Sequence, residues 1–277
     1  MINMVSPFII IIDLDGTIVG DVTYQITSYN IISILKKNKH KVNNANSLPE
    51  CYQNKKKLIR PYFIEFIKTV RRQISNCYIF VYTASDTEWA KKEISWIEKY
   101  NSDVSINRPL FTRTSCININ GQYYKSISKI LPKIQKVVNS HIDTNKILII
   151  DDNSVYIDFQ KNLLLCPRYK HVLFNDIWNL IPKKALSDEK IGRVLLKYIN
   201  SNYLNPVCSK VCDSKTELKY KSHIWFLKKY KDCILCNQEQ KNDKFWLYLS
   251  KFIQKHKSYS IDAEFIVDKF CQKYKTF

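Results

Sequence analysis

Glycine is scarce in this chain: only 4 of its 277 residues are glycine. A dinucleotide-binding Rossmann loop needs three clustered glycines, and a nucleotide-binding P-loop needs two. The four are Gly16, Gly20, Gly121 and Gly192, and their spacing fits neither motif. The sequence therefore excludes both classes of nucleotide loop, and it indicates that the backbone requires glycine where one was kept.

Long apolar runs are also missing. No stretch approaches the ~18 apolar residues of a membrane helix, and the run at 8–12 is too short for the apolar part of a signal peptide. The nine cysteines are an odd number, which favours reduced thiols. We expect an intracellular protein of the nucleus or cytoplasm, not secreted and without a membrane partner.

Acidic residues are outnumbered. The chain has 44 Lys+Arg against 25 Asp+Glu, a formal net charge of +19. Such a balance suits anionic partners, for example phosphoproteins or nucleic acid. The basic residues are spread along the chain, which is typical of a solvated basic surface, so nucleic-acid binding stays open but is not predicted.

What the chain does have is an alternation of buried strands and amphipathic helices. Continuous apolar runs at 8–14, 77–82 and 146–150 predict buried parallel strands. Helical spacing of apolar residues recurs between and around them, at 27–37, 59–74, 86–100 and 126–138. The pattern predicts an α/β fold, a three-layer Rossmann-like parallel sheet.

Two further features complete the predicted organisation. The Asn-Gly pair at 120–121 lies between alternating residues and predicts a small β-hairpin insertion. Beyond Tyr203 the strand signals vanish and aromatic residues recur at helical spacing. We therefore predict a core domain at 1–203 and a basic, mainly helical C-terminal extension at 204–277.

Polar clusters follow three of the predicted strands. They are Asp13-Leu14-Asp15, Thr83-Ala84-Ser85 and Asp151-Asp152. The carboxyl ends of parallel strands meet at one edge of a sheet, where ligands bind. Neighbouring carboxylates repel one another and are tolerated when a cation lies between them. The sequence thus predicts a cation-dependent site at this edge.

The segment from Asp13 to Thr17 carries the most specific chemistry. A carboxylate can attack phosphorus and form an aspartyl-phosphate. A second carboxyl group can protonate the leaving oxygen and later activate water. Gly16 allows the backbone to approach closely, so that N–H groups can surround the phosphate oxygens.

At this point the sequence resembles a known family. DLDGT at 13–17, YTAS at 82–85, Lys125 and the Asp pair at 151–152 are similar to the four motifs of the haloacid-dehalogenase (HAD-like) superfamily of phosphatases. IRPYFIEFI, TRTSCININGQYYK and ILIIDDN resemble the RNA polymerase II carboxy-terminal-domain phosphatases, the NLI-interacting-factor-like group. The resemblance covers about residues 8–180, and stand-alone members encoded by large DNA viruses look similar.

The resemblance implies roles for the acidic residues. Asp13 would be the nucleophile and a Mg²⁺ ligand. Asp15 would be the general acid and base, and would bind the metal through its backbone carbonyl. Asp151 would be a further metal ligand, with Asp152 beside it as a ligand or a support. Oxygen donors of this kind suit Mg²⁺ better than zinc.

The resemblance also implies a phosphate-binding set. Its members are Gly16, Thr17, Thr83, Ser85 and Lys125. Thr83 would hydrogen-bond the transferring phosphoryl group, and Lys125 would offset charge on its oxygens and orient Asp13. Arg113 would border the substrate cleft.

A phosphoserine or phosphothreonine in a protein is the implied substrate, with the tail of RNA polymerase II as the family's candidate partner. The sequence has no insertion large enough for a full capping domain, which favours a macromolecular substrate. Two departures concern recognition: the group usually has an acidic residue where Gly16 stands, and residues 20–57 do not follow its strand-rich pattern.

Other interpretations stay open. A nucleic-acid end or nucleotide phosphatase would also exploit the basic surface, and a non-catalytic viral assembly or nucleic-acid-binding protein on the same scaffold belongs to a different class. Four cysteines of the extension either form a zinc site, with His223 as a substitute ligand, or are small apolar residues of a helical bundle. They are Cys208, Cys212, Cys233 and Cys236.

Overall fold

The structure is a computed structural model of the whole chain, and it describes seven stretches. They are residues 6–20, 23–43, 56–169, 174–185, 188–201, 242–256 and 262–274. The chain divides into two compact units. The sheet unit comprises Met1–Ile18, Pro61–Arg168 and Lys244–Phe277, and the helical unit comprises Val19–Arg60 and Tyr169–Asp243.

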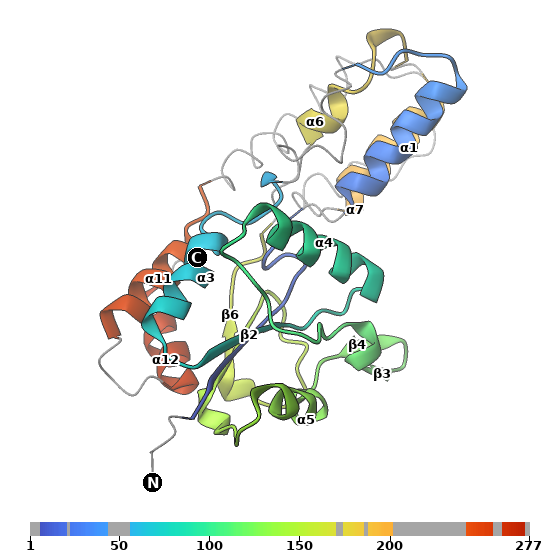
Figure 1. Cartoon of the computed structure of the whole chain (residues 1–277). Coiled ribbons are helices and arrows are strands. Elements are labelled where there is room, and N and C mark those ends of the chain that lie inside the picture. The colour runs from blue at the N-terminus through green and yellow to red at the C-terminus, as the bar shows by residue number, and fades with distance from the viewer. Residues whose placement is uncertain are drawn as a thin grey trace. The chain divides into compact units, whose positions relative to one another are not determined.

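A four-stranded parallel sheet forms the centre of the sheet unit (Figure 1). Its strands are β1 (Phe8–Ile12), β2 (Cys77–Val81), β5 (Ile147–Asp151) and β6 (Leu163–Leu165), in the order β2-β1-β5-β6. The register pairs Ile12 with Val81 on one side and with Ile150 on the other, so these strands end level with one another. The predicted α/β fold is confirmed, and the polar residues that follow β1, β2 and β5 meet at one edge.

Helices of the sheet unit cover this sheet. They are α3 (Phe63–Gln73), α4 (Thr87–Tyr100), α5 (Ile127–Val138), α11 (Phe245–His256) and α12 (Ala263–Lys273). Alternate strand residues such as Ile9 and Ile147 share one apolar core with Ile130 and Ile134 of α5. Helix α12 contacts β5 and β6.

The C-terminal extension is helical where it is described. Trp246 of α11 is fully buried, and its ring centroid lies 5.3 Å from that of Phe63 and 4.6 Å from that of Phe66, both on α3. Helices α11 and α12 confirm that the extension is helical over their own residues, and both belong to the sheet unit. Trp225 and Phe226 of the extension lie outside the described residues, as do His223 and the four candidate zinc cysteines.

The predicted hairpin is present as β3 (Ile117–Ile119) and β4 (Gln122–Tyr124), paired antiparallel. Asn120 and Gly121 both have positive φ, 52° and 83°, as a two-residue turn between right-twisted strands requires. The hairpin ends directly before Lys125 and so delivers this residue to the edge of the sheet.

The helical unit has its own core. Helices α1 (Tyr24–Lys37), α6 (Phe174–Trp178) and α7 (Glu189–Ser201) belong to it, and an apolar cluster links them. Over the described ranges the chain also forms short 3-10 helices at Arg113–Ser115, Thr144–Lys146, Gln160–Asn162 and Lys183–Ala185. Among the residues that the structure describes, no helix is long and apolar enough to cross a membrane.

Candidate active site

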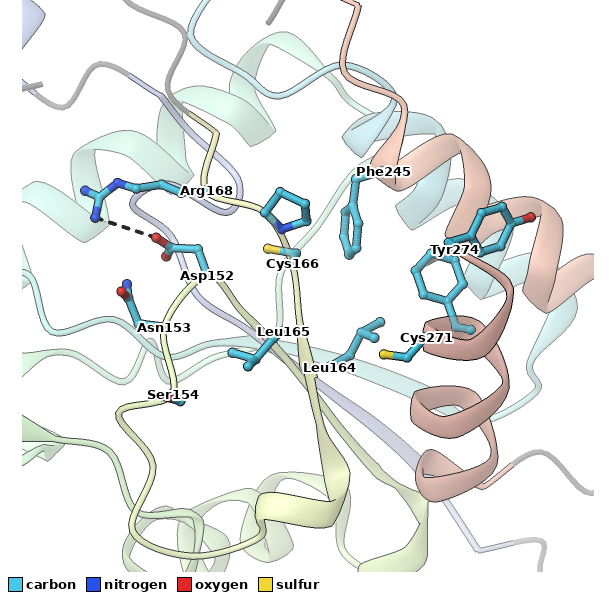
Figure 2. A pocket seen from close by; sticks show the side chains of 12 residues that line it. Asp152, Asn153, Ser154, Leu164, Leu165, Cys166, Arg168, Phe245, Cys271 and Tyr274 are labelled. Carbon is cyan, nitrogen blue, oxygen red and sulfur yellow. Dashed lines mark ion pairs between the residues drawn. The ribbon is translucent and has the colours of Figure 1, made fainter. Parts of the chain in front are cut away.

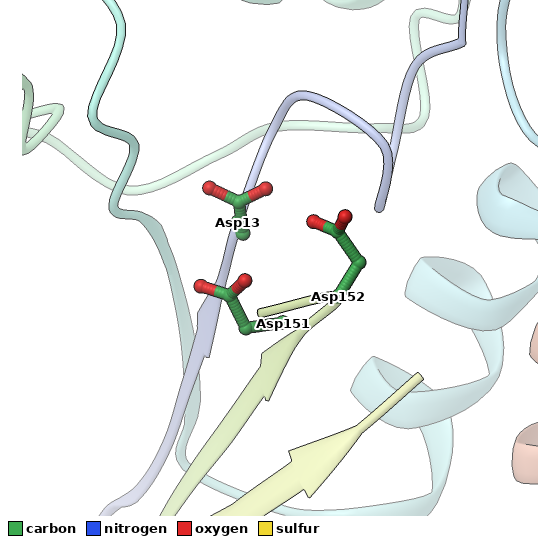
Figure 3. A group of neighbouring side chains, drawn as sticks. All are labelled: Asp13, Asp151 and Asp152. Carbon is green, nitrogen blue, oxygen red and sulfur yellow. The ribbon is translucent and has the colours of Figure 1, made fainter. Parts of the chain in front are cut away.

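A buried lysine lies between two carboxylates at the edge of the sheet. Lys125 Nζ is 2.5 Å from Asp13 Oδ1 and 2.6 Å from Asp151 Oδ2, and all three side chains are almost fully buried. Asp13 directly follows β1 and Asp151 ends β5, the neighbouring strand (Figure 3). The parallel pairing of these strands therefore brings the two predicted acidic residues together.

The backbone around Lys125 is fixed from the loop that follows β5. The Lys125 N–H donates to the Val155 carbonyl, and the Lys125 carbonyl accepts from Ile157 N–H, at 2.9 and 3.0 Å. The ammonium group also lies over two aromatic rings, 5.7 Å from the centroid of Tyr82 and 5.4 Å from that of Tyr156. These contacts hold a charged side chain in a site from which water is excluded.

The charges in this site do not balance. Burial by itself would lower the pKa of Lys125, but Asp13 and Asp151 outweigh it and raise that pKa well above its ordinary value. The lysine is therefore protonated. Burial, together with the charges of Asp151 and Asp15, raises the pKa of Asp13 despite the lysine. The single positive charge of the ammonium group faces more than one carboxylate. The site therefore keeps an excess of negative charge when the carboxylates are ionised, and a further cation would neutralise it.

The residues present fit a divalent metal ion. Each of Asp13, Asp151 and Asp152 offers a carboxylate oxygen, and the three atoms lie within 4.8 Å of one another (Figure 3). Asp152 Oδ2 is buried and accepts no hydrogen bond from the residues that the structure describes. Burial, and next the charge of Asp151, raises the pKa of Asp152. A hard divalent cation binds oxygen donors such as these carboxylates, and the buried Asp152 oxygen without a hydrogen bond is available to bind one.

Asp15 lies in a different environment although it is only two residues from Asp13. Its Oδ2 accepts hydrogen bonds from Thr83 Oγ1 at 3.2 Å and Ser85 Oγ at 2.5 Å, and its Oδ1 accepts one from Trp89 Nε1 at 2.9 Å. The Asp15 side chain is not part of the acidic cluster. The two carboxylates of the loop thus have separate partners, one cationic and one made of neutral donors.

Three hydroxyl residues of the predicted phosphate-binding set form hydrogen bonds with acidic residues of the site. The hydroxyls of Thr83 and Ser85, which we expect at the phosphate, bind Asp15 here. Thr17 is fully buried, and its Oγ1 accepts from the Asp152 N–H at 3.1 Å. Phosphate binding by Thr83, Ser85 and Thr17 stays a prediction, and the structure adds that each of them positions an acidic residue.

Gly16 occupies a backbone position that only glycine can fill. Its φ is +88°, and a Cβ built there would lie 2.9 Å from Asp152 Oδ2 and 3.2 Å from Arg168 Cγ. A side chain at this position would force the Asp152 carboxylate to shift and would press on Arg168, and the positive φ would add backbone strain. The catalytic loop of this chain is therefore matched to Asp152 and Arg168.

Arg113 lies beside the loop that follows β2. Its Nε donates to the Ala84 carbonyl at 2.8 Å, and its guanidinium group lies 5.1 Å from the ring centroid of Tyr123 on the hairpin. The side chain is thereby held between two segments next to Ser85. Its predicted role at the substrate cleft stays a prediction.

Sequence reasoning missed Trp89 and Asp158. Asp158 accepts hydrogen bonds from Ser126 Oγ, Ile127 N–H and Ser128 N–H at 2.7, 2.7 and 3.1 Å, and so fixes the start of α5. Burial opposes its charge, but these hydrogen bonds prevail and lower its pKa. Trp89 could have been found, because it lies in the first turn of the helix that follows a motif strand. Asp158 could not, because no feature of the sequence near it indicates a contact with residues about 30 positions earlier.

A family model described as NLI interacting factor-like phosphatase matches residues 8–181. The match spans more than half of the chain and contains every acidic residue described above, Lys125 and both motif hydroxyls. A search of the curated proteins finds no match.

Proposed function

The chain belongs to the NLI interacting factor-like phosphatase family, a family of phosphoric monoester hydrolases, and we propose that it is a Mg²⁺-dependent phosphatase that forms an aspartyl-phosphate on Asp13 and acts on phosphoserine or phosphothreonine in proteins. The observation that carries the proposal is the separation of two loop carboxylates into two environments. Asp13 lies against Lys125 and Asp151, while Asp15 is held by Thr83, Ser85 and Trp89.

The first half of the reaction is a displacement at phosphorus. An Asp13 carboxylate oxygen attacks, so that an Asp13 O–P bond forms as the ester P–O bond breaks. Asp15 donates a proton to the leaving serine or threonine oxygen. Lys125, which is protonated at neutral pH, offsets negative charge on the transferring group from a fixed position.

The second half releases phosphate. Asp15 now lacks a proton and accepts one from water, which attacks phosphorus and breaks the Asp13 O–P bond. The three hydrogen bonds to Asp15 hold its carboxylate in one orientation for both proton transfers. In the proposed reaction, the same three donors hold Asp15 while it acts as an acid in the first half and as a base in the second.

A metal ion is part of the proposal. Asp13, Asp151 and Asp152 would hold it, and Mg²⁺ fits their oxygen donors. When bound, it supplies positive charge that polarises a phosphoryl oxygen. Thr17 supports this set because its hydroxyl fixes the backbone and carboxylate of Asp152.

A protein substrate is supported by the segment between β2 and Lys125. This segment is fully described and contains α4, one turn of 3-10 helix and a two-stranded hairpin. None of these is a domain that would enclose a small metabolite, although Val19–Arg60, directly after the motif loop, belongs to the second compact unit. The net charge of +19 also favours polyanionic substrates such as a multiply phosphorylated polymerase tail.

The test is a Mg²⁺-dependent assay with three substrate classes: an aryl phosphate, phosphoserine and phosphothreonine peptides, and oligonucleotides phosphorylated at the 3′ or 5′ end. We expect hydrolysis of the aryl phosphate and the peptides, and its loss in Asp13→Asn with an unchanged circular dichroism spectrum. Faster hydrolysis of oligonucleotides than of peptides would overturn the protein substrate in favour of a nucleic-acid end phosphatase. If no class is hydrolysed, the enzymatic proposal is wrong.

A further inference from the structure

A pocket of about 680 Å³ adjoins the acidic cluster. Figure 2 shows it between Asp152 on one side and helices α11 and α12 on the other. Its size lies within the range of ~300–1,000 Å³ that is common for ligand sites. Asp152 belongs both to this pocket and to the candidate metal cluster, so the pocket adjoins the place where the phosphoryl group would be transferred.

The lining changes from polar to apolar along the pocket. Asp152, Asn153 and Arg168 lie at one end, and Phe245 and Tyr274 lie at the other, as Figure 2 shows. Arg168 is half-exposed, and its Nη1 lies 3.7 Å from Asp152 Oδ2. The polarity therefore matches a ligand with an anionic head near Asp152 and an apolar body that extends toward α12.

The apolar end is made by a part of the chain that the family model does not cover. The match ends at residue 181, whereas Phe245, Phe270, Cys271 and Tyr274 come from α11, α12 and the residue after α12. Leu165 lines the same pocket from β6 with an exposed fraction of 50%, and Figure 2 shows its side chain pointing toward Asn153 and Ser154, away from Leu164 and Cys271. An exposed leucine within a pocket is a surface that an apolar ligand would cover.

The aromatic residues favour a side chain over a nucleobase as the occupant. The ring of Tyr274 is stacked on that of Tyr248, with centroids 5.0 Å apart and an interplanar angle of 16°. Phe245 and Phe270 pack edge to face, at 5.9 Å and 86°. These rings already pack against one another, and stacked bases need a free aromatic face. Leucine and ring edges suit aliphatic or aromatic side chains.

We propose that this pocket is a specificity subsite that binds a short apolar segment of the substrate protein next to its phosphorylated residue. The inference rests on the proposed phosphatase function. The phosphorylated residue would lie at Asp13, Arg168 would mark the entrance, and one or two large apolar side chains would contact Leu165 and the aromatic wall.

The test compares phosphoserine peptides that have Leu-Leu or Gly-Gly directly before or directly after the phosphoserine. We expect kcat/KM to be about tenfold higher for one Leu-Leu peptide than for its Gly-Gly counterpart. Leu165→Ser should remove most of this preference by making the wall polar. Cys271→Trp should do so by filling the pocket from the exposed side of α12. Val137→Ser, at an apolar position on α5 that is 41% exposed, is the matched control.

The aryl phosphate separates the two proposals. If the wild type does not hydrolyse it, the proposed function fails and this inference fails with it. If the wild type hydrolyses it but both peptide pairs react equally, the subsite is wrong while the phosphatase stands. A preference that survives in both pocket variants also overturns the subsite, and an effect of Leu165→Ser on oligonucleotides alone would assign the pocket to nucleic acid.

Discussion

The indole N–H of Trp89 donates a hydrogen bond to Asp15, with Nε1 2.9 Å from Oδ1. Trp89 lies in the first turn of α4, whose N-cap Asp86 accepts from the Trp89 backbone N–H. The cap thus fixes the turn, and the turn aims the indole at the catalytic loop. An indole can only donate, so this contact holds an oxygen of Asp15 without competing for its proton.

Trp89→Phe should lower kcat by about tenfold, equivalent to about 1.4 kcal/mol, because Asp15 keeps two of its three donors. The loss should be larger for an alkyl phosphate than for p-nitrophenyl phosphate, since a good leaving group needs less help from an acid. Steady-state kinetics with both substrates measures this. Trp96→Phe, on the same helix, is the control, and an equal loss on both substrates would contradict a role through Asp15.

Lys125→Met should destabilise the fold by about 3–5 kcal/mol, because it leaves Asp13 and Asp151 buried without their shared cation. Urea unfolding followed by fluorescence gives the free energy of unfolding. Added Mg²⁺ should recover part of the loss. Lys133→Met, at an exposed position on α5, should change stability by less than about 0.5 kcal/mol. A variant as stable as the wild type would mean that the two carboxylates do not depend on the lysine.

Removal of the metal should abolish activity and lower thermal stability. A cation at 100 times its Kd stabilises the folded state by about 2.7 kcal/mol. Thermal unfolding of the wild type with EDTA or with Mg²⁺ should show this difference. Asp152→Asn should raise the Mg²⁺ concentration needed for half-maximal stabilisation, whereas Asp103→Asn, which changes an exposed carboxylate, should not. An identical Mg²⁺ response in both variants would remove Asp152 from the metal site.

Asp158→Asn should cost about 1 kcal/mol at pH 7, because the charged acceptor at the start of α5 is lost. The pKa of Asp158 is lowered in the folded state. Its stabilisation is therefore fully present above the unfolded-state pKa of about 3.9, and it disappears as the pH falls through the lower folded-state pKa.

The difference in unfolding free energy between wild type and Asp158→Asn should therefore shrink at acid pH. Urea titrations at pH 7, 5 and 3 measure it, with Glu65→Gln on an exposed face as the control. A difference that stays constant down to pH 3 would show that the carboxylate charge is not what stabilises the helix.

The strands and the motif residues could be predicted because their signals are local. An apolar run such as FIIII cannot be solvated without cost and is therefore buried wherever it lies in the chain. The Asn120-Gly121 turn is likewise set by two residues whose backbone tolerates positive φ. Once parallel pairing is assumed, Asp13 and Asp151 must meet at the same edge.

The partners of these residues could not be predicted from the sequence, because they are set by packing between segments far apart in the chain. Nothing near Asp15 indicates that Thr83 and Ser85 point at it, or that Trp89 reaches it from α4. The pocket is a similar case, since its two walls come from β6 and from α11 and α12, about 80 residues later.

By itself the sequence determined the parallel sheet, the hairpin turn and the phosphatase motifs, since each follows from the local chemistry of a few residues. Of the four glycines, only Gly16 and Gly121 have a positive φ, and Gly192 lies within α7, so scarcity alone did not show that every glycine was required. At Gly16 only the tertiary structure supplied the reason: a side chain there would meet Asp152 and Arg168, which follow strands β5 and β6. The fold likewise decided that one loop carries two carboxylates with different partners, because neutral donors from the β2 side reach Asp15 and the buried Lys125 reaches Asp13. Distances between such groups depend on how layers pack, and no short segment of sequence encodes them.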